Sequence, residues 1–176
     1  EPLEDKLRLV SHRLSVGAGY AGVSFDVFAE GADEAAEPPG TAHQNAFAKA
    51  PEEMLEAWNE QQRAGTADLG VGDLLRESRK PLLLNNIEES AYVTEDQRRL
   101  LAAVGIRSGI VVPLFIDDDM IATMSVGSKE LAGFAMPDEQ FLTAVAAQVA
   151  AIIRMARLVE HLQQATDRLE ESRDET

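Results

Sequence analysis

The sequence predicts an α+β domain in which β-rich runs lie between helices at the two ends of the chain. Alternating apolar and polar residues over 20–29 fit a half-buried strand. Two β-rich runs, 106–116 and 120–127, are separated by three consecutive Asp residues and predict a hairpin. The chain then keeps a helical pattern without a break from about residue 137 to 172. With 176 residues, 45% hydrophobic and 27% charged, it has the length and composition of one compact core with an extended helix.

The first third of the chain predicts a helix, two strands and a second helix. Apolar residues at helical spacing define the first helix, which breaks near Gly17. These apolar positions are Leu3, Leu7, Leu9, Val10 and Leu14. After the first strand, a polar loop over 31–40 leads to a weaker strand at 41–48. Pro51 then opens a helix that has acidic residues in its first turn and ends near Gly65.

The middle of the chain predicts two further helices around a short strand. A helix over 70–78 comes first, and a proline then introduces a short buried strand at 82–84. The next helix runs from Thr94 to Val104. Its Gln97 stands three residues after the capping Thr, which is the spacing of a capping box.

The second strand of the hairpin has two faces of different chemistry. Parity places an apolar set on one face, which suits packing against helices: Met120, Ala122, Met124 and Val126. Ile121, Thr123 and Ser125 share the other face, where they could meet a polar ligand. Ser24 and Asp26 form a similar polar row on the first strand. The alternative is a loop-covered face whose hydroxyls bond to the backbone, but mixed polar and apolar linings favour a pocket.

The long last helix changes character along its length. Its first half carries a broad apolar stripe suited to packing on a sheet: Phe141, Leu142, Val145, Val149, Ile152 and Ile153. Its second half steps by 3 and 4 residues, the pattern of a coiled-coil seam: Met155, Leu158, Leu162, Ala165 and Leu169. We therefore divide the chain into a globular domain at 1–157 and a protruding helix at 158–176, and expect a parallel homodimer through the seam.

The composition excludes several classes of partner and chemistry. With 31 acidic and 16 basic side chains, the net charge of −15 disfavours nucleic acid. The absence of Cys removes disulfides, thiolate metal sites and thiol catalysis. The three His are mutually remote in sequence and the Asp117–Asp119 run favours a turn, so we expect no metal and no cofactor.

The apolar run at 144–153 is shorter than the roughly 20 residues of a membrane span. The chain has no secretory signal, and we expect a cytoplasmic piece of a longer polypeptide.

Short motifs follow one another in a fixed order along the chain from residue 80 to residue 150. They are 80–86, Gly105-Ile106-Arg107-Ser108, Val112-Pro113-Leu114, 121–128, Phe134, Asp138, Phe141-Leu142 and 145–150. Together, in this order and spacing, they resemble a GAF domain, the small-molecule sensory module of signalling proteins. The chain departs from the family at Ala122, where Gly is common, and over 31–70. The resemblance implies a GAF-like, PAS-related antiparallel sheet. The terminal helices would cover one face of it, and a lid of loops and short helices would cover the other.

The resemblance further implies a regulatory sensor whose ligand lies between the sheet and the lid. The residues we expect there are Asn85, Tyr92, Ser108, Thr123 and Ser125, joined by Ser24 and Asp26. Because positive charge is sparse in this region, a neutral or singly charged metabolite is favoured over a highly anionic one.

No catalytic motif appears in the chain, so we expect no enzyme. The sequence has no nucleophile elbow, phosphate loop or paired-carboxylate motif, and the methionine-sulfoxide-reducing branch of the family needs Cys. The long helix is expected to control an output domain, with a cyclic-dinucleotide phosphodiesterase, a diguanylate cyclase and a histidine kinase as candidates. The alternative is a ligand-free dimerisation and relay spacer.

Overall fold

Five antiparallel strands form one sheet within the residues that the computed structural model describes, which are 2–30, 42–47, 53, 56, 57, 60 and 69–175. The strand order across the sheet is β2-β1-β5-β4-β3. The strands are β1 Gly22–Val27, β2 Ala42–Phe47, β3 Leu82–Leu84, β4 Ser108–Ile116 and β5 Asp119–Ser128. The α-helices are α1 Leu3–His12, α3 Val71–Ser78, α4 Glu95–Ala103 and α5 Met136–Asp174. The predicted α+β class and the β4–β5 hairpin are confirmed.

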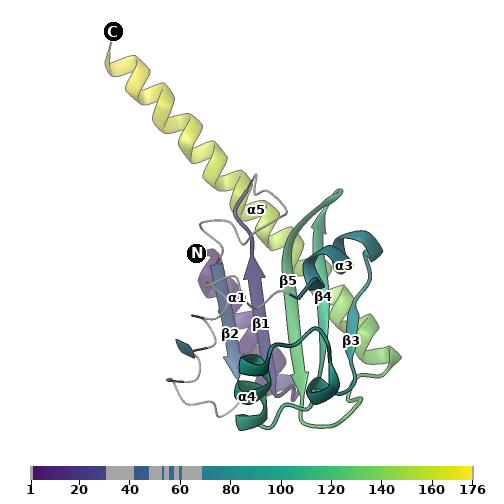
Figure 1. Cartoon of the computed structure of the whole chain (residues 1–176). Helices are drawn as coiled ribbons and strands as arrows, with labels where there is room; N and C mark the ends of the chain where they lie inside the picture. The colour runs from purple at the N-terminus through teal and green to yellow at the C-terminus, as the bar shows by residue number, and fades with distance from the viewer. Residues whose placement is uncertain are drawn as a thin grey trace.

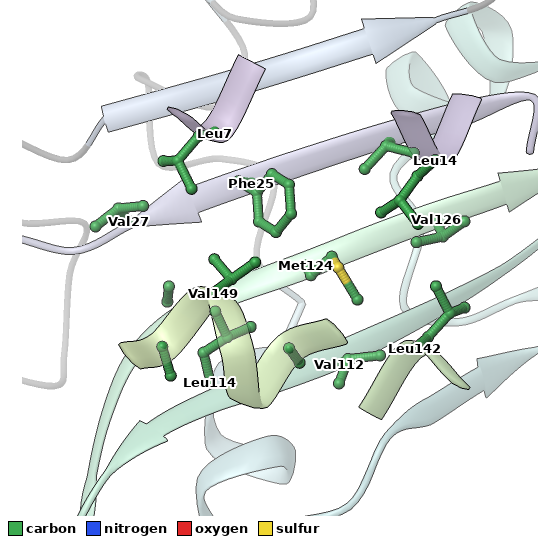
Figure 2. Close-up of a cluster of buried hydrophobic side chains, with 14 of the residues drawn as sticks. Leu7, Leu14, Phe25, Val27, Val112, Leu114, Met124, Val126, Leu142 and Val149 are labelled. Atoms are coloured by element: carbon green, nitrogen blue, oxygen red, sulfur yellow. The ribbon is translucent and has the colours of Figure 1, made fainter. Parts of the chain in front are cut away.

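Helices cover both faces of the sheet, as expected (Figure 1). The terminal helices α1 and α5 lie on one face, where they enclose the main core with β1, β4 and β5. Figure 2 shows Leu7 and Leu14 meeting Phe25 and Val126, while Val149 packs beside Met124. The shorter helices α3 and α4 lie over the opposite face, which we call the lid face.

Local signals set the helix ends. In α4, the Thr94 hydroxyl accepts a hydrogen bond from the amide of Gln97 at 3.1 Å, and the Gln97 side chain accepts one from the Thr94 amide at 2.9 Å. The predicted capping box is therefore confirmed. In α5, the Asp138 carboxylate accepts a hydrogen bond from the Ala135 amide at 3.0 Å, which satisfies one of the free amides at the start of the helix.

Two sequence expectations about the strands are wrong. β3 is an edge strand and not a buried one, because only β4 pairs with it and Leu83 is 39% exposed. The parity of β5 also fails at its start, where Ile121 lies in the main core and Met120 does not. The cause is a register shift: Leu114 pairs with Ala122 but Phe115 pairs with Met120, so β5 has one extra residue. At this bulge the two consecutive residues Ile121 and Ala122 both lie in the main core, and the strict alternation expected from Met120 onward is broken.

The predicted helix at 51–65 falls mostly outside the described residues. Within it, residues 53, 56, 57 and 60 are helical. The polar loop at 31–40 also lies outside the described residues, whereas the weaker strand expected at 41–48 is present as β2.

α5 packs on the sheet with its first half and projects away from the domain with its second half (Figure 1). By length and composition alone it could cross a membrane, since its most apolar 18-residue window has a mean hydropathy of 1.6. A core helix has the same composition, and five α5 residues are buried: Leu142, Ala146, Val149, Ala150 and Ile153. From Leu158 to Glu175 every residue is exposed.

Ser11 gives a stability prediction. It lies on α1, is fully buried, and its hydroxyl has no hydrogen-bond partner among the described residues. A buried unsatisfied hydroxyl costs about 1 to 3 kcal/mol, so Ser11→Ala is expected to raise the free energy of unfolding by about 1 kcal/mol. Thr143→Ala, at an exposed position of α5, is the control for the gain in helix propensity alone. Urea denaturation of both variants checks this, and a lower free energy of unfolding for Ser11→Ala would contradict it.

Tyr20 links the start of β1 to the start of α5. Its ring stacks on Phe134 at 5.8 Å between centroids, and its hydroxyl donates to the Asp138 carboxylate at 3.2 Å. Burial raises the pKa of Tyr20 from 10.0 to about 12, and the negative charge of Asp138 and the hydrogen bond to it add to the rise. The folded chain therefore keeps this proton above the pH at which the unfolded chain releases it.

The raised pKa of Tyr20 predicts an alkaline loss of stability. Its contribution to the free energy of unfolding is complete below about pH 10 and is lost as the pH rises toward about 12. Tyr20→Phe should show a shallower decline than the wild type over this range, measured by urea denaturation at several pH values. Tyr92→Phe removes the other tyrosine hydroxyl of the chain and serves as the control for loss of a tyrosine hydroxyl in general. Equal slopes for Tyr20→Phe and the wild type would contradict the prediction.

Candidate functional site

Four of the predicted site residues come together on the lid face. Ser24 pairs directly with Ser125, and Asp26 pairs with Thr123, across the β1–β5 ladder. Directly paired residues of antiparallel strands project from the same face of the sheet. We call these four residues the polar patch. Ser24 is 5% exposed and Thr123 is also buried, whereas Asp26 and Ser125 are half-buried.

A row of three glycines borders the polar patch at one end. Gly127 of β5 pairs with Gly22 of β1 and Gly109 of β4. A Cβ atom added at Gly127 would lie 2.8 Å from Cγ2 of Ile106, which is closer than side-chain atoms pack. The missing side chains therefore let a small second core lie directly on the sheet. Its buried members are Ala21, Ile87, Val93 and Ile106.

Apolar residues flank the polar patch on β4. Val111 pairs with Ser125 and Pro113 pairs with Thr123, and both are half-buried. The lid face thus has hydroxyl and carboxylate groups beside aliphatic ones, the kind of mixed surface that orients a small ligand. The sheet fixes the backbone positions of all six residues, so the site is held on rigid elements.

The other three predicted residues lie apart from the polar patch. Ser108 is fully buried; its hydroxyl donates to the Glu130 carbonyl and accepts from the Gly133 amide at 3.1 Å. It therefore anchors the loop before α5. Asn85 is exposed, and its carbonyl accepts from the Ala132 amide at 2.9 Å. Tyr92 is half-buried, and its amide donates to the Ser90 hydroxyl at 3.2 Å.

An arginine joins α3 to the β4–β5 turn, which the sequence did not indicate. The Arg79 guanidinium lies 4.1 Å from the centre of the Phe115 ring and donates to the Asp117 carbonyl at 2.9 Å. It also pairs with the Asp118 carboxylate at 3.2 Å. These partners are 36 or more positions apart in sequence from Arg79, so no local pattern could have revealed them. They hold one end of the lid against the sheet.

The polar patch contains an acidic side chain and no basic one. Asp26 is the ionisable member of the patch, and the whole chain carries a net charge of −15. A carboxylate in a partly buried site favours a neutral or cationic group over an anion. Among the described residues, no group of three His, Asp or Glu side chains is placed to hold a metal ion.

Comparisons with known proteins agree with this architecture. The family model for the GAF domain matches residues 6–154. A search of curated proteins found no match. Among solved structures, the GAF domain/HD domain protein from Geobacter sulfurreducens is 14% identical, with a TM-score of 0.67 over 89% of this chain and 94% of that chain.

Two further structures show the same fold. A domain of a putative two-component sensor histidine kinase from Sinorhizobium meliloti is 15% identical, with a TM-score of 0.64 over 93% of this chain and 99% of that one. Free methionine-R-sulfoxide reductase from Neisseria meningitidis, solved with its substrate, is 18% identical. Its TM-score is 0.61 over 90% of this chain and 81% of that chain. The fold and the family match together show that the chain belongs to the GAF domain family of sensory and regulatory modules.

Proposed function

We propose that this GAF domain binds a small polar ligand at the polar patch and passes the binding event to an output domain through α5. The observation that carries the proposal is the placement of the patch. Its hydroxyls and carboxylate lie on the lid face, whereas β1 and β5 present their opposite face to α5 in the main core. A ligand that shifts these strands or the lid therefore acts on a layer that α5 packs against.

The chemistry of the polar patch supports a neutral or singly charged ligand that donates hydrogen bonds. Ser24, Ser125 and Thr123 supply hydroxyls, and Asp26 supplies a carboxylate. Val111 and Pro113 supply apolar contact beside them. A free amino acid, a nucleoside or a small polyol meets these requirements better than a nucleoside triphosphate, which the acidic surroundings would repel.

The projecting half of α5 supports control of an output domain. A helix that leaves the core at Ile153 and stays exposed from Leu158 onward can transmit a change in direction. Similar structures come from a GAF/HD protein and a sensor histidine kinase, which favours a cyclic-dinucleotide phosphodiesterase or a kinase as output, with a diguanylate cyclase as a further candidate.

The exposed seam on α5 supports a homodimer. Leu162 is 68% exposed, and it lies nine residues after the buried Ile153. At 3.6 residues per turn, nine residues make two and a half turns, so Leu162 lies on the helix face opposite to the one that packs on the sheet. The other seam residues that are largely exposed are Met155, Leu158 and Leu169. A second copy could cover this face without disturbing the core.

The proposal includes no catalysis, no nucleic acid and no membrane insertion. The lack of Cys removes thiol chemistry, and the net charge of −15 repels phosphate backbones. Five residues of α5 are buried in the main core, which supports a core helix over a membrane span. We propose a cytoplasmic location. The second candidate function is a relay spacer that binds no ligand. In that case loops cover the polar patch, and its hydroxyls only form hydrogen bonds that stabilise the fold.

A thermal-shift screen separates the two functions. Millimolar amino acids, nucleosides and polyols are tested on the wild type and on Ser125→Ala, with Ser172→Ala on exposed α5 as the matched control. A ligand at 100 times its Kd stabilises the folded state by about 2.7 kcal/mol. The sensor function predicts a shift in melting temperature that Ser125→Ala reduces and Ser172→Ala keeps.

Hydrogen exchange then locates the binding site of any compound that the screen finds. A ligand at the polar patch is expected to slow the exchange of the backbone amides at 121–127. Protection confined to α1 and α5 would remove this site from consideration. If no compound shifts the melting temperature, the relay spacer is favoured.

A further inference from the structure

The segment that leaves β1, Phe28–Glu30, contacts the last part of α5 that touches the domain. The Phe28 carbonyl accepts a hydrogen bond from Nη2 of Arg157 at 2.6 Å. The Glu30 carboxylate forms an ion pair with Arg157, 3.6 Å from its Nε, and lies 2.7 Å from Nε2 of His161. Arg157 and His161 are four residues apart, so they lie on the same face of the helix. We call Phe28, Glu30, Arg157 and His161 the exit clamp.

The exit clamp lies where α5 leaves the domain. Ile153 is the last buried residue of the helix, and Arg157, with 18% of its side chain exposed, follows one turn later. Beyond Arg157 every residue of α5 is exposed. A contact at this point fixes the direction of the rest of α5, because the residues beyond it do not pack against the domain.

The same segment also contacts the lid. The Arg76 guanidinium of α3 lies 6.0 Å from the centre of the Phe28 ring, within range of a cation–π interaction. The Phe28 amide donates to the Ile121 carbonyl of β5 at 2.9 Å, which holds the residue on the sheet. Phe28 therefore contacts α3 with its ring and α5 with its carbonyl.

We propose that Phe28–Glu30 couples the position of the lid helix α3 to the direction in which α5 leaves the domain. The side chains of Arg76 and Arg157 meet the same residue from two elements, so a displacement of α3 changes the contacts that hold α5. The coupling free energy between two sites is reciprocal, so a change at α5 must also affect α3. This inference goes beyond the proposed sensor function, and its test needs neither a ligand nor an output domain.

Hydrogen exchange of the full chain tests the coupling from the α5 side. Arg157→Gln is expected to speed amide exchange about tenfold at 154–161 and also at 71–78 in α3, since a hydrogen bond from a charged group is lost. Glu30→Gln should act in the same direction. Arg154→Gln, an exposed position on the same helix, is the matched control and should change neither segment. Faster exchange confined to α5 would overturn the coupling, and unchanged exchange in both segments would overturn the clamp itself.

A second variant tests the coupling from the lid. Arg76→Gln removes the cation above the Phe28 ring, together with the 3.5 Å ion pair between Arg76 and Asp73 within α3. It leaves the sequence of α5 unchanged and should speed exchange at 154–161. Glu77→Gln, its exposed neighbour on α3, is the control. If Arg157→Gln does not fold, this variant decides alone: unchanged exchange at 154–161 would overturn the proposal, and faster exchange there would support it.

Discussion

Leu162→Glu is expected to weaken self-association of the chain about 100-fold or more. Leu162 is largely exposed in the single chain and lies on the helix face opposite to the sheet. Burying a Leu side chain contributes about 1.5 to 3 kcal/mol, and a symmetric dimer loses two of them when the residue is replaced. The new carboxylates would also face each other in the interface. Sedimentation velocity over a concentration series measures the change in Kd.

The control for this variant introduces the same charge on another face of the same helix. Gln164 is exposed and lies outside the predicted seam, so Gln164→Glu should leave the dimer intact. An unchanged dimer in Leu162→Glu would place the interface elsewhere. A wild-type chain that stays monomeric at high micromolar concentration would show that the seam does not associate by itself.

Leu142→Ala is expected to lower the free energy of unfolding by about 2 to 5 kcal/mol. Leu142 is 0% exposed and lies in the main core, where α5 packs against the sheet (Figure 2). Removal of its side chain leaves a cavity that the surrounding strands can fill only in part. Urea denaturation measures the loss, which is a large part of the 5 to 15 kcal/mol that stabilises a typical domain.

The residue before Leu142 provides its control. The sequence places Phe141 in the core stripe, but its side chain is 47% exposed, so that expectation is wrong. Phe141→Ala should therefore cost less than Leu142→Ala although more atoms are removed. This order of effects follows only if α5 is a core helix in this region. If Phe141→Ala lowered the free energy of unfolding as much as Leu142→Ala or more, α5 would not pack on the sheet as described. A membrane span would then again be a candidate for this apolar helix.

Local sequence signals predicted most of the elements, because each signal acts through neighbouring residues. The capping box of α4 joins positions three apart, and the Asp117–Asp118 turn joins strands that are adjacent in sequence. The long unbroken pattern of α5 predicted both its length and the change from core stripe to exposed seam. Alternation on β1 predicted its apolar face, since side chains of a strand alternate between two faces.

Strand pairing decided which candidate residues share a site. The sequence separates Ser24 from Ser125 by about a hundred positions, and only the β1–β5 register places them side by side. Ser108 met the same criteria as the other candidates, yet its hydroxyl is bonded to the loop before α5. The bulge that exchanges Met120 and Ile121 has no local signature either, since it depends on the length mismatch between two paired strands.

The sequence by itself determined the fold class, the helix ends and the two halves of α5, because these depend on periodicity and capping within a few residues. Only the tertiary structure decided the polar patch, the Arg79 contacts and the exit clamp. His161 and Glu30 are 131 positions apart, and their 2.7 Å contact exists because β1 ends at the side of the domain where α5 leaves it (Figure 1). Contacts of this kind follow from how the layers pack, and periodicity along the chain does not encode them.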